Sequence, residues 1–236
     1  MHCDICHLAK QRKLSFSNNN SRAASVLNTI HVDIWGPSPT ISLNVYKYFL
    51  TIIDDYSRFT WFYLMHNKSE TRMHLVNFIN YAENQFNARV KIIRSDNGHE
   101  FAMKDFFMTK GIIHQTTYDE TPEQNRIVER KHQHLLNVTR ALLFQSKLSK
   151  NFWSYAIEYA TCLINSTPTP SLNDCTPYEK MYNKAFDIEQ LHVFGCLCYV
   201  QTLTSGRKKF DLRAKAGIFC GFRQNTKGYI VYDIKS

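Results

Sequence analysis

The sequence predicts an α/β domain built on a mixed β-sheet, followed by a small β module. Three observations lead to this prediction. Three runs rich in β-branched and aromatic residues come first, separated by short turns. Strand-like and helix-like segments then alternate, which is typical of a sheet with crossover helices. After about residue 190, only short apolar runs separated by turns remain, which indicates a separate β structure.

The first three strands are expected at residues 30–35, 46–54 and 59–65. A Gly-Pro pair closes the first strand, and the turn at residues 55–58 joins the second to the third. Asp54 and Asp55 read as turn residues, because aspartate commonly precedes a turn. Connections this short suit antiparallel neighbours, so we expect these strands to form an antiparallel meander.

The other elements of the sheet domain follow in alternation. Apolar residues recur at helical spacing through residues 69–86, with Ser69 as the expected N-cap of a long helix. Strands are expected at residues 90–94 and 112–116, which gives a sheet of five strands. Further helices are expected at residues 104–110, 123–147 and 151–165, and further short strands at residues 196–203, 217–222 and 228–232.

Charge and composition narrow the classes of protein and of partner. The chain has 236 residues, 29 of them basic and 20 acidic, which gives a formal net charge of +9. Such an excess favours a polyanionic partner, and nucleic acid is the commonest one. The sequence has no secretory signal and no apolar run long enough for a membrane span. Its seven scattered cysteines read as reduced thiols inside a cell.

Three acids stand at the edges of different expected elements. Asp33 lies in the first strand, Asp96 at the end of the fourth, and Glu129 in the first turns of the long helix. The first two acids meet if their strands are neighbours in the sheet, and the helix can cover that edge. Two aspartates and a glutamate can hold two divalent metal ions, which suits phosphoryl transfer. On a basic chain, this chemistry indicates an enzyme that cuts or joins nucleic acid.

Motifs along nearly the whole chain resemble those of one family. They include CDICHLAKQRKLSF, HVDIWGPSP, IRSDNGHEF, NRIVERKHQHLLN, HVFGCLCYV and KFDLRAKAGIFCGF. On these motifs, the chain resembles the integrase segment of copia-type long-terminal-repeat retrotransposon Pol polyproteins. The resemblance implies an RNase H-like core, with a mixed five-stranded sheet flanked by helices, and a small SH3-like β module.

The resemblance also implies an activity and a location. The DDE triad of the family maps onto Asp33, Asp96 and Glu129 as catalytic residues and ligands of Mg²⁺ or Mn²⁺ in a two-metal site. The implied reaction inserts element DNA into host DNA. Element ends and target DNA are then the partners, the chain is a homo-oligomer, and no membrane is involved. The implied location is the nucleus, after a cytoplasmic particle stage.

Three domains are expected. Residues 1–25 read as a truncated zinc-module remnant and linker, residues 26–190 as the catalytic core with its C-terminal helices, and residues 191–236 as the SH3-like module. Cys3 and Cys6 have the spacing of half a zinc site. The resemblance places the two histidines of a full His₂Cys₂ site upstream, so we expect Zn²⁺ to bind weakly or not at all.

Basic and polar residues around Glu129 are the expected DNA contacts. Arg126 and Arg130 are four positions apart and share a helix face. Lys131 adds charge along the same helix, and Asn125 precedes it. Such a face can follow a phosphate backbone.

Two other readings stay open. One is a decayed or domesticated relic that keeps the fold and binds nucleic acid or a protein partner without turnover. It is supported by departures from the family pattern, among them Arg126 where a glycine is usual and only 32 residues between Asp96 and Glu129. Metal-dependent strand transfer would separate an integrase from this relic. The other reading is an RNase H-type hydrolase, which a preference for an RNA–DNA hybrid would favour.

Overall fold

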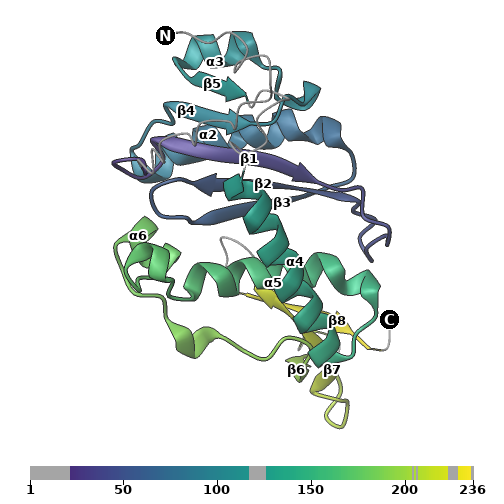
Figure 1. Ribbon diagram of the computed structural model, residues 1–236. Coiled ribbons are helices and arrows are strands. Elements are labelled where there is room, and N and C mark those ends of the chain that lie inside the picture. Colours follow the sequence, from purple (N-terminus) through teal and green to yellow (C-terminus); the bar gives the residue numbers. More distant parts are fainter. Residues whose placement is uncertain (1–21, 117–125, 204, 206, 223–227, 235–236) are drawn as a thin grey trace, which may run out of the picture.

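The computed structural model describes residues 22–116, 126–203, 205, 207–222 and 228–234. Figure 1 shows a large sheet with helices on both of its faces and a smaller sheet next to the helices of one face. The predicted α/β class, with a five-stranded mixed sheet and a separate C-terminal β structure, is confirmed. Among the described helices, none is both long and apolar enough to cross a membrane.

The strands of the large sheet are β1 (Thr29–Trp35), β2 (Tyr48–Asp54), β3 (Thr60–Met65), β4 (Ile92–Ser95) and β5 (Ile113–Thr116). Their order is β3-β2-β1-β4-β5. The strands β1, β2 and β3 pair antiparallel, which confirms the expected meander. The strands β4 and β5 join in parallel on the other side of β1.

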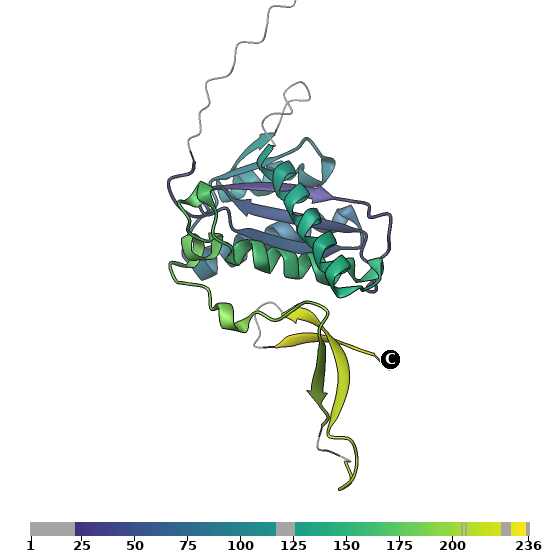
Figure 2. The same ribbon diagram turned by 60° about the horizontal axis from the view of Figure 1, so that its bottom comes forward.

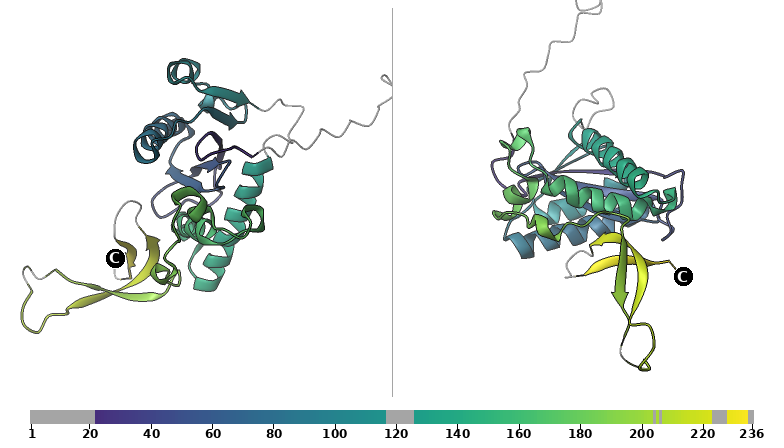
Figure 3. Two further views of the ribbon diagram at one scale, coloured as in Figure 1. Left: turned by 90° about the vertical axis from the view of Figure 1, so that its left-hand side faces the viewer. Right: turned by 90° about the horizontal axis from the view of Figure 1, so that it is seen from below.

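The helices are α2 (Thr71–Phe86), α3 (Lys104–Lys110), α4 (Arg126–Ser146), α5 (Trp153–Ser166) and α6 (Pro177–Tyr182). Figure 3 shows α2 on one face of the sheet and α4 and α5 on the other. Leu75, Phe78 and Ile79 of α2 are fully buried in the core of the first face. Leu135 of α4 and Ile157 of α5 are fully buried in that of the second. The sheet is therefore covered on both faces, which suits parallel strands.

The predicted start of the long helix after β3 was wrong by two residues. A short 3₁₀ helix, η1 (Lys68–Glu70), precedes α2. Ser69 lies inside it and is not the N-cap. The Glu70 carboxylate accepts a hydrogen bond from the Asn67 amide at 2.8 Å, which is half of a capping box that begins at Asn67. The asparagine two residues earlier therefore takes the role assigned to the serine.

The turn between β2 and β3 is braced by its two aspartates. Asp54 accepts hydrogen bonds from the Leu27 amide and the Ser57 amide, each at 2.7 Å. Asp55 accepts one from the Ala23 amide at 2.7 Å. The aspartates were predicted to be turn residues only. In the structure they are almost fully buried and attach the segment that leads into β1 to this turn.

The smaller sheet consists of β6 (Leu197–Gln201), β7 (Ala214–Phe222) and β8 (Tyr229–Asp233), all antiparallel. It rests against α5 through aromatic rings. Tyr159 of α5 meets Phe219 of β7 edge to face, with ring centroids 5.7 Å apart. Figure 2 shows β6 and β7 extending beyond this contact and away from the large sheet.

Strand β3 is an edge of the large sheet, and a side chain satisfies part of that edge. The Asn165 side chain accepts a hydrogen bond from the Thr60 amide at 3.0 Å and donates one to the Thr60 carbonyl at 2.9 Å. Both residues are buried. The asparagine therefore replaces the backbone of a neighbouring strand at this position.

We expect Asn165→Ala to lower the free energy of unfolding by about 2–4 kcal/mol, because it leaves a buried amide and a buried carbonyl without partners. Chemical denaturation measures the change. Asn77→Ala, at an exposed position of α2, is the matched control and should change stability by less than about 0.5 kcal/mol. Equal stabilities of the two variants would contradict the assigned role of Asn165.

Candidate active site

Asp33 projects from β1, the central strand of the large sheet. Its Oδ1 atom accepts a hydrogen bond from the Ile34 amide at 2.8 Å. The side chain is only 16% exposed, so little water solvates its charge. A carboxylate in such a position is stable only if it holds a proton or has a cation nearby.

Asp96 follows directly after β4, which pairs with β1 in parallel. The expected neighbouring of these two strands is confirmed. His31 of β1 lies opposite Arg94 of β4. Continued two residues further along both strands, the same offset places Asp33 opposite Asp96. The charge of Asp96 does act on Asp33. Both acids therefore lie toward the C-terminal ends of adjacent parallel strands, where sites of α/β sheets form.

The loop after Asp96 holds the Asp96 carboxylate by a backbone hydrogen bond. The Gly98 amide donates a hydrogen bond to Asp96 Oδ1 at 3.1 Å. A Cβ atom on Gly98 would lie 2.7 Å from Glu100 Oε2 and 3.0 Å from Asp96 Oδ1. A fourth carboxylate, Glu100, therefore lies on the same side of the loop as Asp96. Lys68 Nζ lies 3.4 Å from Glu100 Oε1 and offsets part of this charge.

Helix α4 brings Glu129 and His132 to the same region. Glu129 lies in the first turn of the helix and is exposed. His132, almost one turn later, is buried, with its Nε2 atom 2.7 Å from Thr51 Oγ1 and its Nδ1 atom 3.7 Å from Asp33 Oδ2. Burial lowers the pKa of His132 to about 4, so the imidazole is neutral at pH 7. It packs beside Asp33 without neutralising it.

The pKa of Asp33 depends on the charges of two other acids, Asp96 and Glu129, in this region. Burial is the main cause that raises the pKa of Asp33 to about 7, and the Ile34 amide opposes it. The nearby charges of Asp96 and Glu129 raise the pKa further, whereas Lys68 lowers it. Like charges within reach of one another disfavour ionisation. A cation placed among the three carboxylates would remove both the repulsion and the proton.

The donors fit a hard divalent cation in kind. Carboxylate oxygens are the ligands that Mg²⁺ and Mn²⁺ prefer. Within the described part of the chain, however, no three carboxylate, imidazole or thiol side chains are close enough together to form a ready metal cage. The acids are near enough to influence the charge of Asp33, and a metal would have to draw them closer.

The expected DNA contacts of α4 differ in their surroundings. Arg130 is exposed. Lys131 is half-buried, and its ammonium donates to the Arg58 carbonyl at 3.4 Å. Burial, followed by the charge of Arg58, lowers the pKa of Lys131 to about 8. Of these two residues, Arg130 is the one placed to meet a phosphate. Four further predicted site groups lie outside the described residues: the side chain of Arg126, and Asn125, Cys3 and Cys6.

The sequence-based prediction missed three residues of this region: His132, Glu100 and Lys68. His132 carried a signal, because it follows Glu129 by three positions and so shares its helix face. Glu100 followed Asp96 in the same loop, but its approach depends on the path of that loop. Lys68 carried none, since it comes from η1, after β3, and is brought close by tertiary structure alone.

Two family models match the chain. An integrase core domain matches residues 1–122. A retroviral polymerase SH3-like domain matches residues 196–236. The first match ends before Glu129, so it includes Asp33 and Asp96 and leaves the third acid to the arguments above. The second match begins just before β6 and includes the smaller sheet.

The chain is similar to longer plant proteins. It is 34% identical, over 98% of its length, to the retrovirus-related Pol polyprotein from transposon RE2 of Arabidopsis thaliana. It is 32% identical, over 98% of its length, to that from transposon TNT 1-94 of Nicotiana tabacum. The chain spans only 16% and 18% of these relatives.

A solved structure shares the fold. A chain of the simian T-cell lymphotropic virus intasome, solved in complex with the PP2A regulatory subunit B56 gamma, aligns with a TM-score of 0.55. The alignment covers 89% of the present chain and 78% of that chain, at 15% identity. At this identity, the likeness supports the fold and leaves residue roles to the geometry.

The pKa of Asp33 predicts a pH-dependent stability. The folded chain holds a proton on Asp33 up to about pH 7, whereas the unfolded chain releases it near the ordinary value of 3.8. Stability without metal should therefore fall as the pH rises between these values. We expect Asp33→Asn to be more stable than the wild type by about 2–4 kcal/mol at pH 8 and nearly equal to it at pH 4.

Urea denaturation at both pH values, with a chelator present, measures this difference. The matched control is Asp174→Asn, which removes an exposed carboxylate from a turn and should have little effect at either pH. If Asp33→Asn were no more stable than the wild type at pH 8, Asp33 would be ionised without cost, and the crowding of acids would be refuted.

Proposed function

The chain belongs to the integrase family of plant copia-type retrotransposon Pol polyproteins, and we propose that it joins element DNA to host DNA by metal-dependent strand transfer. Its substrates are the ends of linear element DNA and a target duplex. The proposal includes a homo-oligomeric assembly, because two DNA ends and one target must meet, and a nuclear site of action. No membrane takes part.

One observation carries the proposal: the parallel pairing of β1 with β4 brings Asp33 and Asp96 to the same edge of the sheet, where the charges of Asp96 and Glu129 act on the half-buried Asp33 carboxylate. Crowded acids destabilise a fold unless a cation or a proton offsets them. An enzyme that uses divalent metal has a reason to keep this arrangement, because perturbed acids of this kind are common at functional sites.

The residues divide the work as follows. Asp33, Asp96 and Glu129 would hold Mg²⁺ or Mn²⁺, and two such ions, when bound, activate the attacking oxygen and stabilise the leaving oxygen. To act as a ligand, Asp33 would have to be deprotonated. The Gly98 amide orients the Asp96 carboxylate through its hydrogen bond to Oδ1. His132 packs against Asp33 and, through Thr51, is fixed to β2.

DNA binding rests on charge. The chain carries a net charge of +9. Arg130 stands on the exposed side of α4, next to Glu129, where a phosphate close to the metals would lie. Such contacts supply affinity with little sequence preference.

A second candidate function is a nucleic-acid-binding protein without turnover. The observation that favours it is the absence of a ready metal cage among the described residues. It shares the fold and the basic surface with the first candidate and differs only in the chemistry at the three acids.

We expect Asp33→Asn, Asp96→Asn and Glu129→Gln each to reduce Mg²⁺-dependent strand transfer by at least about a thousandfold, because each removes a ligand charge from the metals. DNA affinity should change by less than about threefold, since phosphate contacts provide it. The assay uses a labelled DNA end and a plasmid target. Glu189→Gln, an exposed and distant exchange of the same kind, should keep full activity. An inactive wild type that still binds DNA would favour the second candidate.

Arg130→Ala should weaken DNA binding equally for unrelated sequences. If the guanidinium neutralises one phosphate, the slope of log affinity against log salt should become smaller by about 0.9 for duplex DNA. Fluorescence anisotropy at several salt concentrations measures both quantities. Lys131→Ala is the comparison, and we expect a smaller change of slope because its ammonium is already bonded to the Arg58 carbonyl. An unchanged slope for Arg130→Ala would remove this residue from the DNA surface.

A further inference from the structure

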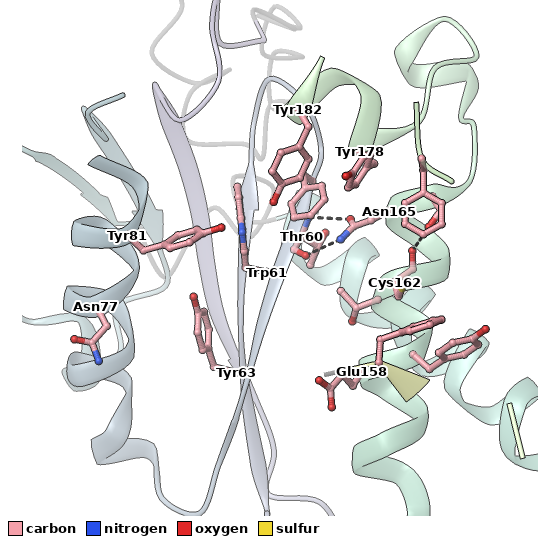
Figure 4. A pocket seen from close by; sticks show the side chains of 16 residues that line it. Thr60, Trp61, Tyr63, Asn77, Tyr81, Glu158, Cys162, Asn165, Tyr178 and Tyr182 are labelled. Carbon is pink, nitrogen blue, oxygen red and sulfur yellow. Dashed lines mark hydrogen bonds between the residues drawn. The ribbon is translucent and has the colours of Figure 1, made fainter. Parts of the chain in front are cut away.

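A cavity of about 390 Å³ lies at the edge strand β3, two strands away from β1 and Asp33. Helix α2 borders it on one side, and α5 and α6 on the other. Figure 4 shows Tyr63 of β3 and Tyr81 of α2 on one wall, Tyr178 and Tyr182 of α6 above, and Glu158 of α5 below. The cavity has the size of a typical ligand pocket, and the roles assigned above do not involve it.

Glu158 is the unusual member of this wall. Its side chain is half-buried, and a glutamate that loses part of its water usually has a partner. Among the described residues, none gives Glu158 a hydrogen bond or an ion pair. Its environment shows in its pKa, which burial raises to about 7. An uncompensated carboxylate in an aromatic cavity is a cost to folding, so a ligand that supplies a positive charge would explain why it is there.

The aromatic wall is also suited to a cation. Ring faces attract ammonium groups, most strongly where water is excluded. The chain itself gives an instance at the rim, where the Lys184 ammonium lies 5.9 Å from the ring centroids of both Tyr178 and Tyr182. Aromatic faces together with one carboxylate match an ammonium that can also donate hydrogen bonds.

The edge of β3 indicates what carries this ammonium. An edge strand presents unpaired amides and carbonyls on its outer side. At Thr60, the side-chain amide of Asn165 binds both of these backbone groups. Along a strand, the backbone amide and carbonyl of every second residue point to the same side. Those of Phe62 and Leu64 therefore point outward, as those of Thr60 do. A polypeptide can use such groups, and a free amine cannot.

We propose that this cavity binds the ammonium group of a lysine side chain presented by a partner polypeptide that lies along the edge of β3. The carboxylate of Glu158 accepts its hydrogen bonds, and the tyrosine rings enclose its methylene chain. This inference is independent of the proposed strand transfer, since it uses none of the residues around Asp33.

The probe is the blocked peptide Ac-STVKVTS-NH₂, titrated into the full chain by calorimetry at about 0.15 M salt. A second peptide has norleucine in place of lysine, which keeps the shape and removes the charge. We expect the norleucine peptide to bind at least tenfold more weakly. Glu158→Gln should weaken the lysine peptide to a similar extent, whereas the exposed exchange Glu189→Gln should leave it unchanged.

The pH gives a readout that does not depend on a variant. Affinity for the lysine peptide should rise about tenfold from pH 6 to pH 8, as Glu158 loses its proton. The other titratable groups that face the cavity, or pack against its wall, are Cys162, Tyr63, Tyr81, Tyr159, Tyr178, Tyr182, Lys184 and His74. Burial raises the pKa of Cys162 and takes that of Tyr63 to about 12, and burial lowers that of His74, so none of these three explains a rise between pH 6 and pH 8.

Five outcomes would overturn the proposal. Equal affinities of the lysine and norleucine peptides would mean that charge plays no part. An unchanged affinity in Glu158→Gln, or no binding of the lysine peptide at all, would remove the cavity as its site. Tighter binding of a trimethyl-lysine peptide would show that the cavity prefers a quaternary ammonium, which cannot donate hydrogen bonds to Glu158. Equal affinity for n-butylammonium would show that the ligand is a free amine and that the edge of β3 takes no part.

Discussion

The parallel pairing of β1 with β4 is the constraint on which the candidate active site depends. It joins the antiparallel meander to the crossover half of the sheet, and its register sets Asp33 beside Asp96. A slip of one residue would turn every side chain of a strand to the other face. The apolar residues around Asp33 prevent such a slip, because Ile30 and Val32 are fully buried. The fold therefore holds two like charges together at the expense of stability.

The loss of stability caused by the crowded acids bears on function, because a bound cation would remove it. Burial and like charge act on Asp33 together, and the neutral His132 beside it does not relieve them. Glu158 is a second carboxylate that has lost part of its water. No other acid among the described residues lines its cavity, and its neighbours there are mainly aromatic rings. In both places, a half-buried carboxylate has no ion pair with a lysine or arginine of the described part of the chain. We interpret both as sites prepared for a cation, a metal ion in one and an ammonium in the other.

Much of the fold followed from local patterns. The strand and helix periods of β1, β2 and α3 gave bounds within two residues, because these segments pack one clear face. The start of α2 was missed because Asn67, Ser69 and Glu70 offer competing caps, and only the capping box at Asn67 decides between them. Asp33 and Asp96 could be named from their positions within or after strands, and Glu129 from its position in the first turn of the long helix. Lys68 and the pocket at Glu158 could not, since segments distant in sequence assemble them.

The central claim is that Asp33, Asp96 and Glu129 share divalent metal. A crystal of the chain soaked in Mn²⁺, with diffraction collected at the manganese absorption edge, tests it most directly. The account predicts anomalous peaks bonded to the Asp33 and Asp96 carboxylates, with Glu129 drawn in from its exposed position. Mn²⁺ bound only at other carboxylates, with Asp33 still protonated beside His132, would contradict it.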